Sequence, residues 1–320
     1  MTMFNMGLAP KGNGVEEWLF VGTNGVASAE REYYWTRPPS ARIVYMMIQN
    51  GGAGGGGGFT RASGAQGGGG GGGSGGSYAR LIVPAVFMPT QLIIRPSNGG
   101  LGGSGSGQAG VGPSAGAISF LTSPAAALRT IGLSTAGTAA GAGTGAAGGG
   151  AGAANTINSQ LTASWLSNIY IGVTASGIAG GVGNATTTSA AVNAGATAFG
   201  HGASGGAGVT TGDVVGQGNA SGQPSSTGTN GLRTFSANPA GAGLNGNAGQ
   251  TFGMNGLTIT GDNMLPVGAC AGNGGNSGGV VAGGRGGDGG WGCGGGGGGA
   301  GTTGGAGGNG GPGFVYIVAW

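Results

Sequence analysis

Residues 51–76 read GGAGGGGGFTRASGAQGGGGGGGSGG, and this stretch decides what the chain can be. Glycine supplies 91 of the 320 residues, and charged residues make up only 5%. Glycine loses more conformational entropy on folding than any other residue, so such a chain needs a repeated interaction to offset that loss. Two forms are open for this block, a flexible linker or closely packed glycine, and we expect close packing.

Closely packed glycine can form a polyproline-II-type helix, with three residues per turn and no internal hydrogen bonds. Its N–H and C=O groups must then bond to neighbouring helices, which approach closely because glycine has no Cβ. Collagen is excluded because the glycines lack a three-residue period. We therefore predict a mainly β protein with polyglycine-II helices, in which short strands from both chain ends accompany a glycine-rich lattice and there is little or no α-helix.

Composition divides the chain into four parts. Residues 1–40 carry dense charge and aromatic side chains and are predicted to be an N-terminal attachment segment. Residues 41–134 hold strands and the first glycine block. Residues 135–267 form a low-complexity Gly/Ala/Thr/Ser/Asn region, and residues 268–320 hold the second glycine block and a terminal strand.

Short β-prone apolar runs flank the glycine blocks and predict strands. The clearest runs are residues 15–22, 41–49, 79–83, 91–95, 117–123, 164–173 and 314–320. Residues 124–133 suit a strand or a turn of helix. Because one glycine block follows an apolar run and the other precedes one, we expect residues 314–320 to pair with or pack near residues 42–49, so that both chain ends meet in a sheet.

Charge and hydropathy exclude several classes of protein. The formal net charge is +3, but the basic residues do not cluster into a stripe, so we do not expect nucleic acid as a partner. No apolar run approaches 18 residues, so membrane insertion is not expected. The N-terminus lacks the pattern of a signal peptide, which predicts synthesis in a cytoplasm.

Candidate catalytic and metal-binding residues are few. The pattern G-x-S-x-G occurs around Ser74, Ser204 and Ser277, and His201 lies three residues before Ser204, but no strand-turn-helix elbow surrounds them. We therefore expect no enzyme activity. The chain has one histidine, two cysteines and no carboxylate cluster, so neither a metal nor another cofactor is expected.

Two smaller features remain open from the sequence. Cys270 and Cys293 could form a disulfide, although cytoplasmic synthesis favours thiols. The isolated Asp213, Asp262 and Asp288 are interpreted as turn residues that cap nearby amides.

Isolated aromatic residues in glycine-rich surroundings are the candidate contact residues. These are Phe199, Phe235, Phe252 and Trp291. They either fill gaps between glycine passes or stand exposed for a partner, and filling is favoured because exposed large aromatics are uncommon without one.

Four motifs carry a resemblance to a known family: WTRPPSA at 35–41, GGAGGGGG at 51–58, GGGGGGGSGGSYAR at 67–80 and GGAGGNGGPGFVYIVAW at 304–320. They resemble the glycine-rich domain of tailed-bacteriophage virion proteins, over about residues 35–112 and 268–320. In composition the chain is also similar to the polyglycine-sandwich adhesins of phage tail fibres, in which loops at one end of the scaffold recognise the host surface.

The resemblance implies a structural protein of the virion, a tail-fibre or tail-tip component that contributes to host-surface recognition. Its partners would be other virion proteins and a host surface glycan or outer-membrane protein, and a homo-oligomer such as a trimer is expected. The alternative is a capsid decoration or head-fibre protein that stabilises the shell. An ice-binding protein is a third reading, because polyglycine bundles can present threonine-rich faces.

Overall fold

The structure is a computed structural model of the 320-residue chain. It describes residues 15–23, 25, 31–113, 117–122, 127–133, 139–145, 147–153, 171–185, 200–218, 221, 258–260, 266–269 and 271–320. These residues cover most of both glycine blocks and both flanking strand regions.

Strands from both ends of the chain form one antiparallel sheet of five strands. Its order is β1 (Glu16–Val21), β11 (Phe314–Ala319), β3 (Ile43–Gln49), β4 (Tyr78–Pro84) and β8 (Ile171–Ala175). β11 pairs with β3 over its whole length, from Phe314 opposite Gln49 to Ala319 opposite Val44. The predicted pairing of residues 314–320 with 42–49 is therefore confirmed.

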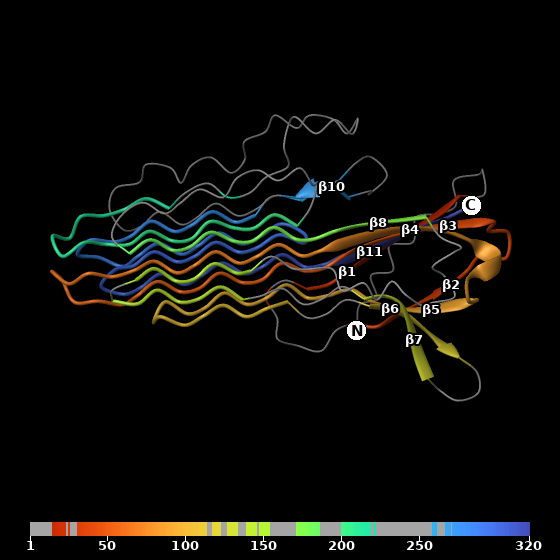
Figure 1. Ribbon diagram of the computed structural model, residues 1–320, viewed down its shortest axis with the longest axis horizontal. Helices are drawn as coiled ribbons and strands as arrows, with labels where there is room; N and C mark the ends of the chain where they lie inside the picture. The colour runs from red at the N-terminus through yellow and green to blue at the C-terminus, as the bar shows by residue number, and fades with distance from the viewer. Residues whose placement is uncertain are drawn as a thin grey trace.

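A second sheet lies beside the first (Figure 1). Its order is β2 (Tyr33–Thr36), β5 (Gln91–Arg95), β6 (Ala117–Thr122) and β7 (Ala127–Leu133), and every pairing is antiparallel. The segment 124–133, left open between helix and strand, thus contributes a strand. β9 (Thr258–Thr260) and β10 (Pro266–Ala269) form a separate pair.

Helix is almost absent from the described residues, which contain only the 3-10 turn η1 (Ala85–Phe87). The prediction of a mainly β protein with little helix is confirmed in this respect. η1 connects the two sheets at the position where Pro84 ends β4, because proline cannot donate a ladder hydrogen bond.

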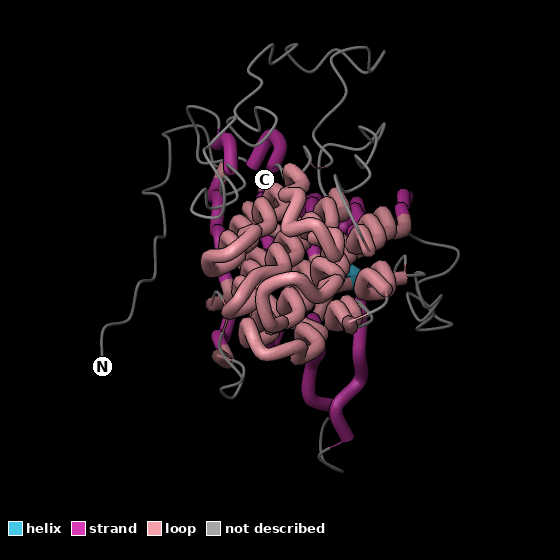
Figure 2. The backbone as a smooth tube through the Cα atoms, turned by 90° about the vertical axis from the view of Figure 1, so that its left-hand side faces the viewer, coloured by secondary structure: helices cyan, strands magenta, loops and turns pink. Residues whose placement is uncertain are grey.

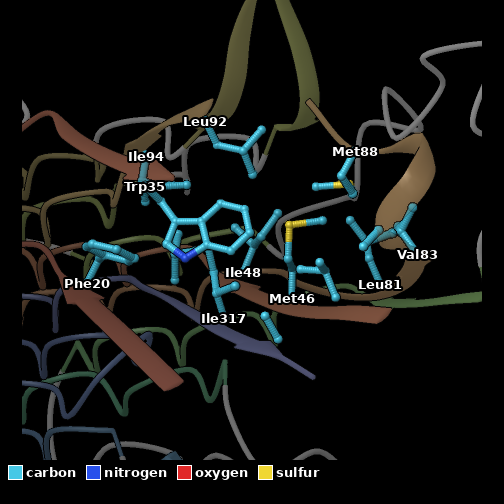
Figure 3. Packing of buried hydrophobic residues seen from close by; sticks show 14 residues of the cluster. Phe20, Trp35, Met46, Ile48, Leu81, Val83, Met88, Leu92, Ile94 and Ile317 are labelled. Carbon is cyan, nitrogen blue, oxygen red and sulfur yellow. The ribbon is translucent and has the colours of Figure 1, made fainter. Parts of the chain in front are cut away.

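Alternate residues of the strands fill the space between the two sheets, as a period of two requires. Trp35 of β2, Met46 of β3, Ile94 of β5 and Ile317 of β11 are all buried in this cluster (Figure 3). Trp18 meets Trp35 edge to face with ring centroids 5.4 Å apart. This core fixes the ends of the strands from which the glycine blocks begin.

The glycine blocks run from the sheets as long, narrow segments that lie side by side (Figure 1). In segment 51–60 the N–H groups donate in a cycle of three residues to three different neighbours. The bonds are Gly52 to Gly311 (2.9 Å), Ala53 to Ser74 (2.9 Å), Gly54 to Val111 (3.0 Å), then Gly55 to Gly308 (2.9 Å), Gly56 to Gly71 (2.8 Å) and Gly57 to Gln108 (2.8 Å). Each neighbour therefore receives one bond from every third residue.

Carbonyl groups of segment 51–60 accept from three further neighbours. The donors are Gly100 and Gly103, then Gly295 and Gly298, and finally Gly143. Segment 51–60 is thus surrounded by six other stretches of chain. Segments 67–76 and 292–301 are hydrogen-bonded in the same way to six neighbours each, and the view from the end shows such segments bundled together (Figure 2). We call this bundle the glycine network.

Close approach of the backbones explains why glycine is required inside the network. A Cβ on Gly56 would overlap the carbonyl oxygen of Gly141, and a Cβ on Gly52 would overlap that of Cys293. Gly150, at the exposed side of segment 147–153, differs because a Cβ there would meet no atom within 4 Å. The need for glycine is therefore a property of the interior positions.

Polar side chains accept hydrogen bonds from backbone N–H groups that have no carbonyl of a neighbouring segment within reach. Asn276 accepts the N–H of Gly218 at 2.7 Å, and Ser97 accepts that of Gly51 at 2.5 Å. Asp288 accepts the N–H of Asn309 at 2.6 Å. Asn, Ser and Asp thus satisfy N–H groups that would otherwise be lost at the borders of the network.

A small apolar cluster joins the network to the outer face of the five-stranded sheet. Met47, Phe314 and Tyr316 contribute from the strands, and Ala203, Ala271 and Cys293 contribute from the glycine segments. The sheet and the network therefore share one continuous interior.

Candidate functional site

The glycine segments reverse direction at the end farthest from the sheets, which we call the distal end (left in Figure 1). Polar or larger residues interrupt the glycine sequence there, because a turn cannot continue the pattern of lateral hydrogen bonds. We call five of the turns there the distal turns, namely residues 60–66, 104–108, 210–215, 279–283 and 301–304.

Arg61 lies among these turns with its side chain fully buried. Its guanidinium donates to the carbonyl oxygens of Ala62 (3.0 Å), Ala65 (2.7 Å) and Gly279, and its Nη2 forms an ion pair with Oδ1 of Asp213 at 2.6 Å. A planar guanidinium can bind several acceptors at once. Arg61 therefore ties its own turn to two turns from distant parts of the chain.

Asp213 completes this junction from the opposite side. Its φ of 58° is the only positive φ among the described non-glycine residues, a conformation that Asp tolerates in turns. Its carboxylate accepts the Gly64 N–H (3.1 Å) and the Ser63 hydroxyl (3.0 Å). The Gly64 amide, and then the Arg61 guanidinium, hold the pKa of Asp213 below its usual value.

Thr60 makes a second connection beside Arg61. Its hydroxyl donates to the carbonyl oxygen of Gly105 (2.8 Å) and accepts the N–H of Gly304 (2.9 Å). Two successive residues thus link all five distal turns to one another.

Four exposed valines lie on the distal turns 210–215 and 279–283, and we call them the distal valine patch. Val214, Val215, Val280 and Val281 are 58%, 38%, 66% and 36% exposed. The two turns that carry them are adjacent: a Cβ added to Gly279 would lie only 3.3 Å from Cγ1 of Val215. Neighbouring exposed apolar side chains on a soluble surface mark a contact site more often than single ones do.

Electrostatically the distal end is nearly neutral. Arg61 and Asp213 are the charged residues of its described turns, and they neutralise each other. The same turns also contain serine, threonine and glutamine. Such a surface can bind an uncharged partner through apolar contact and a few hydrogen bonds. Because hydrogen bonds already fix the turns, they lose little conformational entropy on binding.

The aromatic residues singled out in the sequence are not part of this surface where the structure describes them. Phe199, Phe235 and Phe252 lie outside the described residues. Trp291 is half-buried and packs on Phe314, with ring centroids 5.7 Å apart, at the junction of sheet and network. Trp291 therefore fills space where the glycine segments meet the five-stranded sheet.

The serines of the G-x-S-x-G patterns are interior residues of the network. Ser74, Ser204 and Ser277 are fully buried, as is His201. The hydroxyl of Ser204 accepts the N–H of Gly274 at 2.8 Å, so it replaces a backbone carbonyl inside the network. Such a hydroxyl satisfies the backbone of its own network.

Other chemical groups in the described part of the chain are sparse. No three His, Cys, Asp or Glu side chains there lie close enough to hold a metal ion. Cys293 is buried, and Cys270 lies outside the described residues, as does Asp262. Asp213 and Asp288 each accept a backbone N–H group, but only Asp213 lies in a turn, whereas Asp288 lies within a glycine segment and accepts the N–H of the distant Asn309. None of the described helices could span a bilayer.

Sequence reasoning missed Arg61 and the distal valine patch, although a signal was present. The run FTRASGAQ interrupts the first glycine block at residues 59–66, and GDVVG and GGVVAGG carry valine pairs within glycine. A break of this kind marks a turn of the glycine segment.

No family model matches this chain, and a search among curated proteins finds none similar to it.

Proposed function

We propose that the chain is a virion structural protein of a tailed bacteriophage, a tail-fibre or tail-tip component whose distal end contacts the host surface. The carrying observation is the set of distal turns, fixed by the buried Arg61 and bearing the exposed distal valine patch. The resemblance of the motifs at 35–80 and 304–320 to phage glycine-rich domains supplies the biological context.

The glycine segments in this proposal are polyglycine-II helices. Three residues per turn would direct three successive N–H groups to three neighbours, and the bonds of segment 51–60 follow that cycle. Six hydrogen-bonded neighbours around each interior segment also suit such a lattice. It would provide stiffness with few large apolar side chains, which a projecting virion component needs.

Host recognition through this end would use many weak contacts. A single neutral patch of four valines offers limited affinity, but repeated copies on one particle raise the effective affinity by multivalency. The partner would be a surface glycan or an outer-membrane protein. The chain would act as part of a homo-oligomer with other virion proteins, without enzymatic activity or cofactor.

Binding to host cells tests the proposal at the distal end. The double variant Val214→Ser/Val280→Ser should bind cells at least about tenfold more weakly than the unchanged protein, since about 1.4 kcal/mol corresponds to a factor of ten. Its melting temperature should hardly move because both side chains are exposed. Unchanged cell binding by a folded double variant would contradict the assignment of this surface.

A capsid decoration or head-fibre protein is the alternative function. One observation favours it: large apolar side chains are exposed at both ends, Val214 and Val280 distally and Val86 at the sheet end, which suits a protein that bridges two neighbours. Ice binding receives less support, because one outward row of the network carries Arg285 and Asp288 instead of regular threonines.

A further inference from the structure

The sheet end of the molecule, which we call the proximal end, forms a continuous rim (right in Figure 1). The N–H of Ala85 donates to the carbonyl oxygen of Arg42 (2.7 Å), and the N–H of Arg42 donates to that of Trp320 (2.6 Å). The 3-10 turn η1, the start of β3 and the end of β11 therefore lie side by side. This rim is at the opposite end of the long axis from the distal turns.

Large apolar side chains project from this rim. Ala85 and Met88 face the core, so the two residues between them, Val86 and Phe87, point outward with 78% and 45% exposure. Trp320, on the same rim and separated from η1 by Arg42, is 41% exposed. We call Val86, Phe87 and Trp320 the proximal apolar patch. Exposed apolar groups gathered in this way are costly in water unless a partner covers them.

Basic residues border the same patch. Arg42 is exposed, and the guanidinium of Arg37 donates to the carbonyl oxygen of Ala85. Neither arginine takes part in the ion pairs found among the described residues, which join Arg61, Arg95 and Arg285 to carboxylates. Both arginines lie on the side of the rim formed by η1 and the start of β3, whereas Glu16 of β1 lies opposite Ala319 on the other side.

We propose that the proximal apolar patch is the surface by which the chain attaches to another virion protein, one that presents an apolar surface bordered by carboxylates. Complementary charge would align the two surfaces, and the apolar contact would supply most of the affinity. A symmetric contact with a second copy fits less well, because the patch would meet itself and bring Arg42 and Arg37 against the same arginines. This inference rests on the proposed virion function and leaves the distal end free for the host.

Site-specific cross-linking on assembled particles tests the attachment surface. A photo-reactive residue replaces Phe87 in the full chain, and a matched one replaces Val214. Particles are then purified from the phage that carries the gene, irradiated, and their cross-linked proteins identified by mass spectrometry. The expected result is a cross-link from position 87 to a different virion protein and none from position 214.

Substitutions measure the contribution of each part of the surface. Val86→Ser/Phe87→Ser and Arg42→Glu should each lower the number of copies per particle at least about tenfold, while Val214→Ser/Val280→Ser leaves the copy number unchanged. All of these side chains are exposed, so unchanged melting temperatures will show that the variants fold. Arg42→Glu also tests the charge directly.

The outcomes separate the two proposals. Particles that contain the chain but show a cross-link from position 87 only to a second copy, or no cross-link there, overturn the attachment surface and leave the virion function standing. Normal copy number with Val86→Ser/Phe87→Ser overturns it equally. Absence of the chain from purified particles overturns the virion function and the attachment surface together.

Discussion

At the scale of single residues, the fold depends both on glycines, whose lack of a Cβ allows backbones to approach closely, and on a few long polar side chains. No other residue fits at position 56, because a Cβ there would overlap the carbonyl oxygen of Gly141. Arg61 shows the opposite case, since one long side chain satisfies acceptors from three turns. Both kinds of residue act through non-local contacts, which no short sequence window contains.

Alanine substitution separates interior glycines from exposed ones. Gly56→Ala should lower the free energy of unfolding by about 3 kcal/mol or more, because its methyl group forces two hydrogen-bonded backbones apart. Gly150→Ala should be neutral or raise it by about 0.4 to 1 kcal/mol, because it only restricts the unfolded chain. Chemical denaturation of both variants makes the comparison, and equal effects would contradict the network.

Acid should weaken the junction at the distal end. The folded-state pKa of Asp213 lies below its unfolded value, so its stabilising contribution is present above the unfolded pKa of about 4 and is lost as pH falls through the folded pKa. Asp213→Asn should therefore destabilise the protein at pH 6, and the difference from the unchanged protein should shrink toward pH 2. A difference that stayed constant with pH would show that the carboxylate charge plays no part.

At the scale of elements, the strands with apolar runs were predictable, whereas the turns and the short strands β2, β9 and β10 were not. Runs such as residues 91–95 and 314–320 are apolar and β-prone in themselves, so local composition was enough to identify β5 and β11. The distal turns depend on which segments lie side by side. Ser63 and Asp213 meet across 150 residues of sequence, and no spacing rule connects them.

The polar residues at the borders of the glycine network provide a test at this scale. Asn276→Ala removes the acceptor of the Gly218 N–H in a buried position, which should cost about 1 to 3 kcal/mol. Thr303→Ala is the matched control, because Thr303 is exposed and only its backbone carbonyl is used. Thermal unfolding of the two variants gives the answer. Equal melting temperatures would mean that side-chain acceptors are dispensable at the borders.

At the scale of the whole molecule, the two ends differ in chemistry while the glycine network holds them apart. The proximal end has a hydrophobic sandwich core, exposed apolar residues and two arginines, Arg37 and Arg42, that take no part in the ion pairs found among the described residues. The distal end has valines on turns whose charges cancel. Because the two ends differ in this way, we place attachment at the proximal end and host contact at the distal end. Composition alone predicted the glycine-rich character of the molecule but carried no information about which residues occupy each end.

The most direct test of this account is the location of the two ends on the particle. An azide-bearing residue at Thr211, in a distal turn, or at Ser40, near the proximal rim, would be coupled to nanogold and imaged by cryo-electron microscopy. We predict gold at the tail tip for both positions, with the Thr211 label farther from the tail axis or baseplate than the Ser40 label. Gold on the head surface, or the Ser40 label outermost, would contradict the account.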